Sequence, residues 1–125
     1  MDFKEIRMQV NSRTFRLHYV ELENAVVAFF LEERTRLGTV AIAMPGSGEI
    51  ASGRSSVLVG GKYIMTTRAL AEKLAGKKGK ISVVSLFTML DEAEALRIYS
   101  KLLDKMQVMK EECETFPNSS VRQNA

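Results

Sequence analysis

The sequence predicts an α+β fold in a single domain, with one mostly antiparallel sheet of about six strands and two helices on one face of that sheet. Three observations support this prediction. Two stretches near the N-terminus, 5–10 and 13–22, alternate between apolar and polar residues, as half-buried strands do. Two later runs, 25–31 and 39–44, are apolar at almost every position. The C-terminal half then follows a strand–helix–strand–helix pattern.

The first two strands are predicted from this alternation and from the turns beside them. Asn11-Ser12 favours a tight turn between the strands at 5–10 and 13–22. One side of the two strands is apolar and consists of Ile6, Met8, Val10, Phe15, Leu17 and Tyr19. A second tight turn at Glu23-Asn24 favours a hairpin with the third strand, 25–31. We therefore expect the N-terminal half to form an antiparallel meander.

The second half is predicted from its capping residues and its apolar periodicity. A short strand at 56–59 precedes a helix that Thr66 or Thr67 is expected to cap. This helix is predicted to end near Ala75, because Gly76 favours the left-handed conformation of a helix terminus. The last strand is predicted over residues 80–86.

The final helix is predicted from about residue 91 to residue 110, with Asp91 as its first residue. Its apolar positions recur with helical spacing and comprise Leu96, Tyr99, Leu102, Leu103, Met106 and Met109. Periodicity is lost from Glu111 onward. We therefore expect a folded domain over residues 1–110 and a disordered C-terminal tail over residues 111–125.

Three of the predicted strands, 25–31, 39–44 and 80–86, direct apolar side chains toward both faces of the sheet. Two helices can cover only one of these faces. The other face is therefore expected to be used for dimerisation, most simply with a second copy of the chain. The residues predicted for this dimer face are His18, Val20, Val27 and Phe29.

Composition indicates a soluble globular protein of the cytoplasm. The hydrophobic fraction of 46% and the charged fraction of 26% are ordinary for a folded domain, and 125 residues suffice for one core. No apolar run is long enough to span a bilayer, and the N-terminus does not resemble a secretion signal. The single cysteine excludes an intrachain disulfide and favours a reducing compartment.

The positive charge is concentrated in one segment. The net charge is +3, and residues 66–80 alone contain five basic residues and one acidic residue. Such a segment could meet nucleic acid or an acidic protein surface. Lysines at the end of a helix also complement the helix dipole, and no aromatic residue alternates with them to stack on bases. Nucleic acid is therefore the less favoured partner.

No catalytic, cofactor or metal site is predicted. Residues 48–55 match a phosphate-binding loop with Arg54 in place of lysine, but a strand follows where that motif needs a helix. His18 is the only histidine and lies in a predicted strand. Cys113 lies far along the chain in the expected tail, so a Cys–His nucleophile pair is improbable. We therefore expect a protein that acts by binding and is not an enzyme.

The order and spacing of several segments carry a resemblance to a known family. These segments are RTFRLHYVEL, AVVAFFLEE, LGTVAIAMP, VLVG, TTRALAEKLA, KISVVSL and the amphipathic final helix. Between about Thr14 and Met109, the sequence resembles the small proteasome assembly chaperones and their archaeal relatives. Larger chaperones of that pathway end in a hydrophobic-Tyr-any tail. This sequence ends in RQNA, which is consistent with the small subgroup.

The resemblance implies a dimer that binds proteasome α-type subunits, helps to arrange them into a ring, and leaves as β-type subunits arrive. The dimer partner would be a second copy or a paralogue, and no cofactor is implied. Charge and expected exposure suggest the contacts with the client, which are Lys62, Tyr63, Thr66, Lys77, Lys78 and Lys80. The alternative is a small basic domain that binds nucleic acid or a small ligand. Salt dependence would separate the two, because phosphate binding weakens steeply with salt.

Overall fold

The computed structural model describes residues 2–46 and 54–115. Six strands and two helices occur in the order β1 (Lys4–Val10), β2 (Arg13–Glu21), β3 (Ala25–Leu31), β4 (Thr39–Met44), β5 (Arg54–Val59), α1 (Ile64–Lys78), β6 (Ile81–Leu86) and α2 (Glu92–Thr115). The strands form one sheet in the order β1-β2-β3-β6-β4-β5. Only β3 and β6 are parallel, and the other neighbours are antiparallel. The predicted α+β fold with one mostly antiparallel sheet is confirmed.

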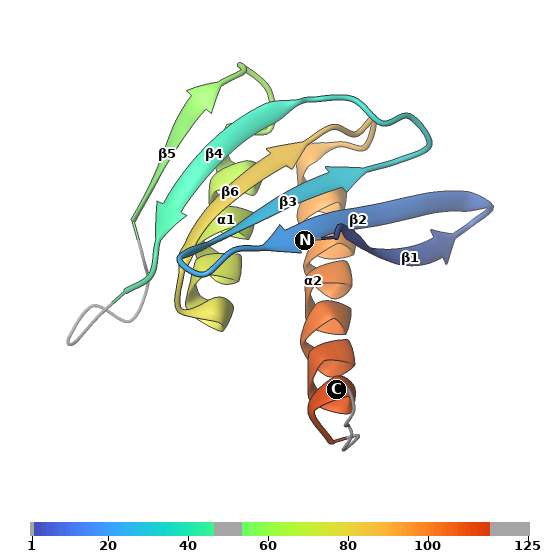
Figure 1. The fold of residues 1–125 in the computed structure, drawn as a ribbon. Coiled ribbons are helices and arrows are strands. Elements are labelled where there is room, and N and C mark those ends of the chain that lie inside the picture. The colour runs from blue at the N-terminus through green and yellow to red at the C-terminus, as the bar shows by residue number, and fades with distance from the viewer. Residues whose placement is uncertain (1, 47–53, 116–125) are drawn as a thin grey trace.

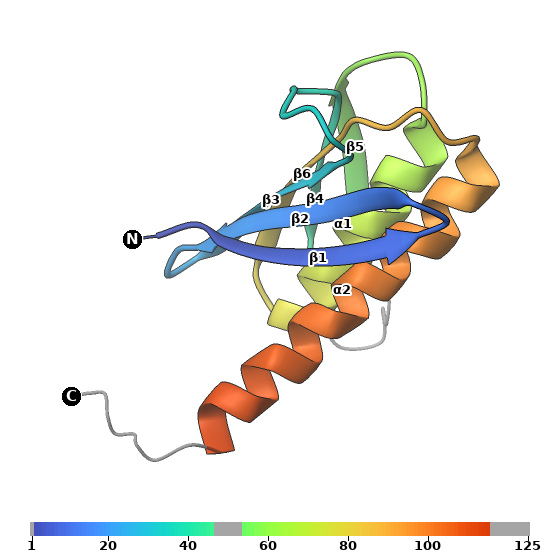
Figure 2. The same ribbon diagram turned by 90° about the vertical axis from the view of Figure 1, so that its right-hand side faces the viewer.

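Both helices lie on the same face of the sheet (Figures 1 and 2). Helix α1 packs on β4, β5 and β6, whereas α2 packs on β1 and β2, and the two helices contact each other. The centre of the core is Tyr99 of α2, which contacts Phe15 and Phe30 edge-on at ring-centroid distances of 5.8 and 5.6 Å. Its hydroxyl donates to the carbonyl of Leu31 at 3.0 Å. This bond satisfies the one polar atom of a fully buried ring.

Both predicted ends of α1 are wrong. The helix begins at Ile64, after Tyr63 in the left-handed conformation, so Thr66 and Thr67 lie within its first turn. The backbone amide of Thr66 instead donates to the Glu92 carboxylate of α2 at 3.0 Å. A side chain from a distant segment therefore takes the role that was expected of a local threonine. The helix ends at Gly79, with a φ of 66°, and not at Gly76.

Helix α2 begins as predicted, because the Asp91 carboxylate accepts a hydrogen bond from the Glu94 amide at 2.8 Å. Two details of the prediction are wrong. The helix continues to Thr115, five residues beyond its predicted end at Lys110. Leu96, which was expected on the buried stripe, is 40% exposed. The buried side chains described are Ala95, Ile98, Tyr99, Leu102, Leu103 and Met106. Most of the predicted tail, residues 116–125, lies outside the described residues, as does loop 47–53.

The backbone just before β4 approaches the end of β6 so closely at Gly38 that no side chain fits. A Cβ there would lie 2.0 Å from the Leu86 carbonyl oxygen, whereas one on Gly61 would meet nothing within 4 Å. We expect Gly38→Ala to lower the free energy of unfolding by about 2 kcal/mol or more, because backbone must move. Gly61→Ala is the matched control and should change it by less than about 1 kcal/mol. Chemical denaturation of the two variants measures the difference, and equal midpoints would contradict the close approach.

Candidate protein-binding surfaces

The face of the sheet opposite the helices is here called the open face, because neither helix covers it. Its middle strands present an apolar band that consists of Val27, Phe29, Val40, Ile42, Met44, Ile81 and Val83. Met44 is exposed, and the other six are partly exposed. Phe3 packs on Phe29 with ring centroids 6.0 Å apart and is itself 59% exposed. The open face is thus a surface rich in large apolar side chains.

The structure brings together the four residues predicted for a dimer face. In the antiparallel pairing of β2 with β3, His18 lies opposite Phe29, and Val20 lies opposite Val27. All four belong to the open face, because the residues that alternate with them are buried against the helices. The sequence also predicted apolar side chains on this face from 39–44 and 80–86, but the members of the band on β4 and β6 were not named among the dimer-face residues.

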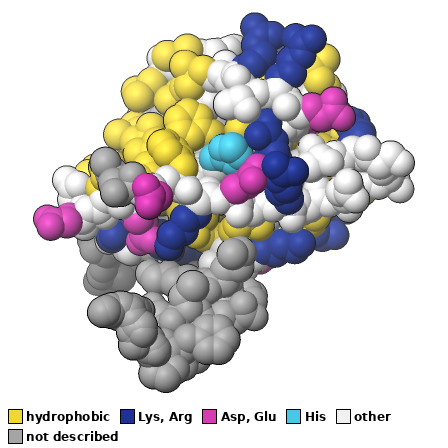
Figure 3. All heavy atoms as spheres, turned by 45° about the vertical axis from the view of Figure 1, so that its right-hand side comes forward, with side chains coloured by type: hydrophobic (Ala, Val, Ile, Leu, Met, Phe, Trp, Pro, Cys, Tyr) yellow, Lys and Arg dark blue, Asp and Glu magenta, His cyan; other side chains and the backbone are white. Residues whose placement is uncertain are grey.

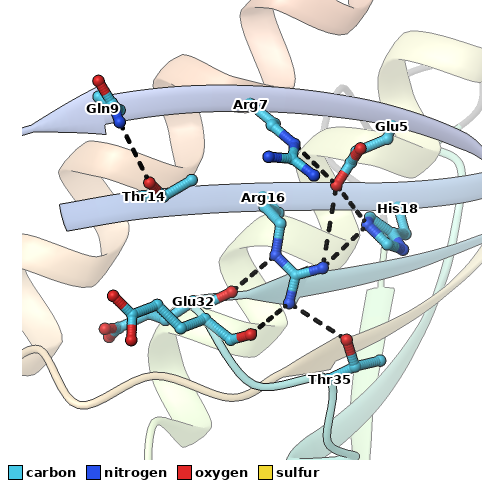
Figure 4. A network of polar contacts seen from close by, with 9 residues as sticks. Glu5, Arg7, Gln9, Thr14, Arg16, His18, Glu32 and Thr35 are labelled. Carbon is cyan, nitrogen blue, oxygen red and sulfur yellow. Dashed lines mark hydrogen bonds and ion pairs between the residues drawn. The ribbon is translucent and has the colours of Figure 1, made fainter.

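A charged cluster on β1 and β2 borders the apolar band (Figures 3 and 4). The Glu5 carboxylate contacts His18 Nε2 at 2.8 Å and Arg7 Nε at 3.1 Å, and Arg16 approaches it at 3.8 Å. Hydrogen bonds from His18 and then Arg7 lower the pKa of Glu5 below its ordinary value. Arg16 also donates to the carbonyl of Glu32 at 2.8 Å. The cluster therefore ties the edge of the sheet to the connection that follows β3.

The residues predicted to contact a client lie in two separate places. Lys62, Tyr63 and Thr66 are at the end of the sheet where both helices begin, here called the helix-start end. Lys77, Lys78 and Lys80 lie at the other end of α1, a helix of 15 residues. That length corresponds to about 22 Å. Lys62 is exposed and Tyr63 is half-buried, whereas Thr66 is buried and donates its hydroxyl to the carbonyl of Glu92 at 3.1 Å.

The basic segment at the end of α1 is neutralised by carboxylates of the same chain. Lys77 lies 3.3 Å from Asp104, and Glu21 lies 3.2 Å from Lys78 and 3.3 Å from Lys80. The side chain of Lys78 is only 2% exposed. The segment is therefore not the row of free cations that a nucleic-acid backbone would need.

Within residues 2–46 and 54–115, no group of three or more His, Cys, Asp or Glu residues is arranged to hold a metal ion. In the same part of the chain, no helix has the length and apolar character needed to cross a membrane.

A comparison with protein-family models finds no match, and neither does a comparison with curated proteins. Among solved structures, the chain is similar to a chain from the crystal structure of a chaperone complex for yeast 20S proteasome assembly. The TM-score is 0.57 and the sequence identity is 19%, over 86% of this chain and 98% of the yeast chain. This protein therefore has the fold of a proteasome assembly chaperone, as its sequence resemblance implied.

Proposed function

We propose that this chain is a non-enzymatic assembly chaperone of the cytoplasm that binds proteasome α-type subunits and promotes formation of the α ring. The observation that carries the proposal is the fold that it shares, over nearly the whole of both chains, with a component of a yeast proteasome assembly chaperone complex. The sequence resemblance from Thr14 to Met109 points to the same family independently of that fold.

The proposed chaperone acts as a dimer through the open face. Large apolar side chains on a sheet face without helices favour burial against a protein surface. A second copy or a paralogue would cover the band around Phe29, Ile42 and Val83, and a specific interface of this kind buries about 800 Å² per partner. The charged cluster around Glu5 and Arg16 would then lie at the rim of the interface.

Nucleic-acid binding is disfavoured by the contacts of the basic residues. Lys77, Lys78 and Lys80 would have to leave Asp104 or Glu21 before they could neutralise phosphates. The same exchange would weaken any role of these lysines in client binding. Of the six proposed client contacts, Lys62 is the one that is exposed and that forms no ion pair within the described residues.

Co-expression with proteasome α subunits from the same organism tests the proposed function. We expect a several-fold higher yield of assembled rings, as measured by native gel and light scattering, than with α subunits alone. Phe29→Asp, which places a charge in the apolar band, should reduce this effect. An unchanged yield of rings across all α subunits would contradict the proposal, and salt-sensitive binding to DNA or RNA in its place would favour the alternative.

A further inference from the structure

The helix-start end concentrates exposed apolar side chains that the open face does not explain. Three connections form this end: β3 to β4, β5 to α1, and β6 to α2, which lie together in the upper part of Figure 1. Ten large apolar side chains are exposed in the described part of the chain, and half of them belong to these connections or to the residues beside them. These five are Leu37, Val59, Ile64, Met65 and Met89. Met65 and Met89 are 77% and 76% exposed.

The surface between these connections is hollowed. Three neighbouring hollows have volumes of about 360, 400 and 440 Å³. The first two share Phe87 and Met89, and the second and third share Lys62 and Tyr63, so the three hollows adjoin one another and are here together called the depression. Glycines at positions 38, 60 and 61 line its middle part and leave it open.

Hydrogen bonds between the connections hold this depression in shape. The Thr39 hydroxyl donates to the carbonyl of Lys62, which joins β4 to the start of α1. The Tyr63 hydroxyl donates to the carbonyl of Leu90 at 2.5 Å, which joins the start of α1 to the start of α2. The Gly38 amide donates to the hydroxyl of a serine on β6 at 2.9 Å. A preformed surface binds with a smaller loss of conformational entropy than a mobile one.

Cations without ion-pair partners surround the apolar side chains. Arg34, Arg36 and Lys62 form no ion pair with any described residue, although Arg36 stacks over Phe87 at 5.3 Å. This arrangement contrasts with the lysines at the other end of α1, which all face carboxylates.

Three exposed carboxylates also lie at this end. Asp91 accepts from the amide of Glu94, and Glu92 accepts from the amide of Thr66. Glu33 is exposed, and its carboxylate forms no hydrogen bond or ion pair within residues 2–46 and 54–115. These amides are neutral, so Asp91, Glu92 and Glu33 keep their charge and form no ion pair with any described residue. Positive charge is therefore in excess only around the first hollow, where Arg34 and Arg36 face Glu33 and the Arg13-paired Glu32.

We infer that the helix-start end is the client-docking surface, and that it fits a folded protein whose contact patch is apolar and carries carboxylates on the side that meets Arg34 and Arg36. This inference rests on the proposed function, in which that protein is the α-type subunit. The apolar centre around Met65 and Met89 supplies burial, and Arg34 and Arg36 supply complementary charge on one side of the rim. Lys62 is a further exposed cation, on the side of Asp91 and Glu92. An apolar centre favours a protein partner over a nucleic acid, because the phosphate backbone of a nucleic acid is bound by cationic side chains and not by apolar ones.

The first test removes the apolar centre. The double variant Met65→Ser, Met89→Ser should keep its fold, because both side chains are largely exposed, and its affinity for the purified α subunit that the wild-type chain binds should fall at least about tenfold. The matched control is Leu22→Ser, Leu96→Ser, which removes two exposed leucines elsewhere and should change the affinity less than about twofold. Isothermal titration measures both, and sedimentation checks that each variant retains the oligomeric state of the wild type.

The second test reverses the charge of the rim. Arg34→Glu, Arg36→Glu, Lys62→Glu should weaken binding of the same α subunit about tenfold or more, with the loss mainly in the association rate. The control Lys4→Glu, Lys101→Glu, Lys105→Glu makes the same change in net charge at exposed positions elsewhere on the chain. Its effect should be at least severalfold smaller.

The outcomes separate this inference from the proposed function. Absence of α-subunit binding by the wild-type chain would reject both. Wild-type binding that the two helix-start variants leave unchanged would reject only the docking surface. A shift of the oligomeric state in these variants would reassign the surface to a contact between copies, and binding of RNA or DNA that only the charge variant abolishes would reassign it to a nucleic acid.

Discussion

Phe29→Asp should convert the proposed dimer into a folded monomer. The side chain lies in the centre of the apolar band and is partly exposed in the single chain, so an aspartate there can remain hydrated in the monomer. In a dimer the same carboxylate would be buried without a partner, at a cost of several kcal/mol. We expect the dimer dissociation constant to rise about 100-fold or more, which corresponds to about 2.7 kcal/mol.

Sedimentation of the wild type and of this variant over a concentration series measures the change. Leu96→Asp is the matched control, because Leu96 is also partly exposed but lies on α2, on the other side of the molecule. It should dimerise like the wild type. A Phe29→Asp protein that is still dimeric and melts at the wild-type temperature would remove the open face from the interface.

Glu32→Ala should destabilise the fold far more than the removal of an exposed charged side chain. The Glu32 side chain is only 12% exposed. It accepts from Arg13 at 2.7 Å and from the Met89 amide at 2.6 Å, and also from the Thr88 hydroxyl. Its removal leaves these donors without their acceptor, and we expect a loss of about 3 kcal/mol in the free energy of unfolding. Glu33→Ala, an exposed neighbour, should change it by less than about 0.5 kcal/mol.

The effect of Glu32 should depend on pH in a defined direction. Burial alone would raise the pKa of this carboxyl, but the hydrogen bonds from Thr88, Arg13 and the Met89 amide outweigh burial and lower the pKa below 4.5. A lowered pKa in the folded state adds stability above pH 4.5, and that stability is lost as the pH falls through the folded-state pKa. The difference in the free energy of unfolding between the wild type and Glu32→Ala, measured by urea denaturation, should therefore be largest near neutral pH and decrease under acidic conditions. A difference that grows on acidification would contradict the assigned contacts.

The sequence was sufficient to predict most strands because their signals are local. Alternation with period two located β1 and β2, and runs that are wholly or mainly apolar located β3, β4 and β6 within a residue or two. The same runs predicted a second apolar face, because side chains in a strand point alternately to the two sides. The four residues proposed for that face do lie together on it.

Long-range contacts account for what the sequence did not predict. The start of α1 is capped by the Glu92 carboxylate, which accepts a hydrogen bond from the Thr66 amide. These two residues are 26 positions apart in the sequence. Glu32 directly follows the apolar run 25–31 in the sequence, and its burial follows only from the meeting of β2, β3 and the segment after β6. The insertion of β6 between β3 and β4, which makes the one parallel pair of the described sheet, likewise leaves no local pattern.

The candidate client contacts show the same limit. The sequence predicts Lys62, Lys77, Lys78 and Lys80 together as client contacts because all four are basic. Whether a lysine forms an ion pair depends on the carboxylate that folding brings close to it. Folding places Glu21 and Asp104 beside the three lysines at the end of α1. The sequence could predict that the chain carries basic residues, and only the structure distinguishes paired from unpaired ones.

Native mass spectrometry of the chain mixed with each purified α-type subunit tests the proposed chaperone function most directly. We expect the chain alone to have the mass of a dimer, and with at least one α subunit to give a complex of two copies of the chain and one α subunit at roughly 20 μM protein. This complex should persist at physiological salt, because apolar burial contributes most of its stability. A monomeric chain, together with spectra that contain only the separate components for every α subunit, would contradict both the dimer and the chaperone function.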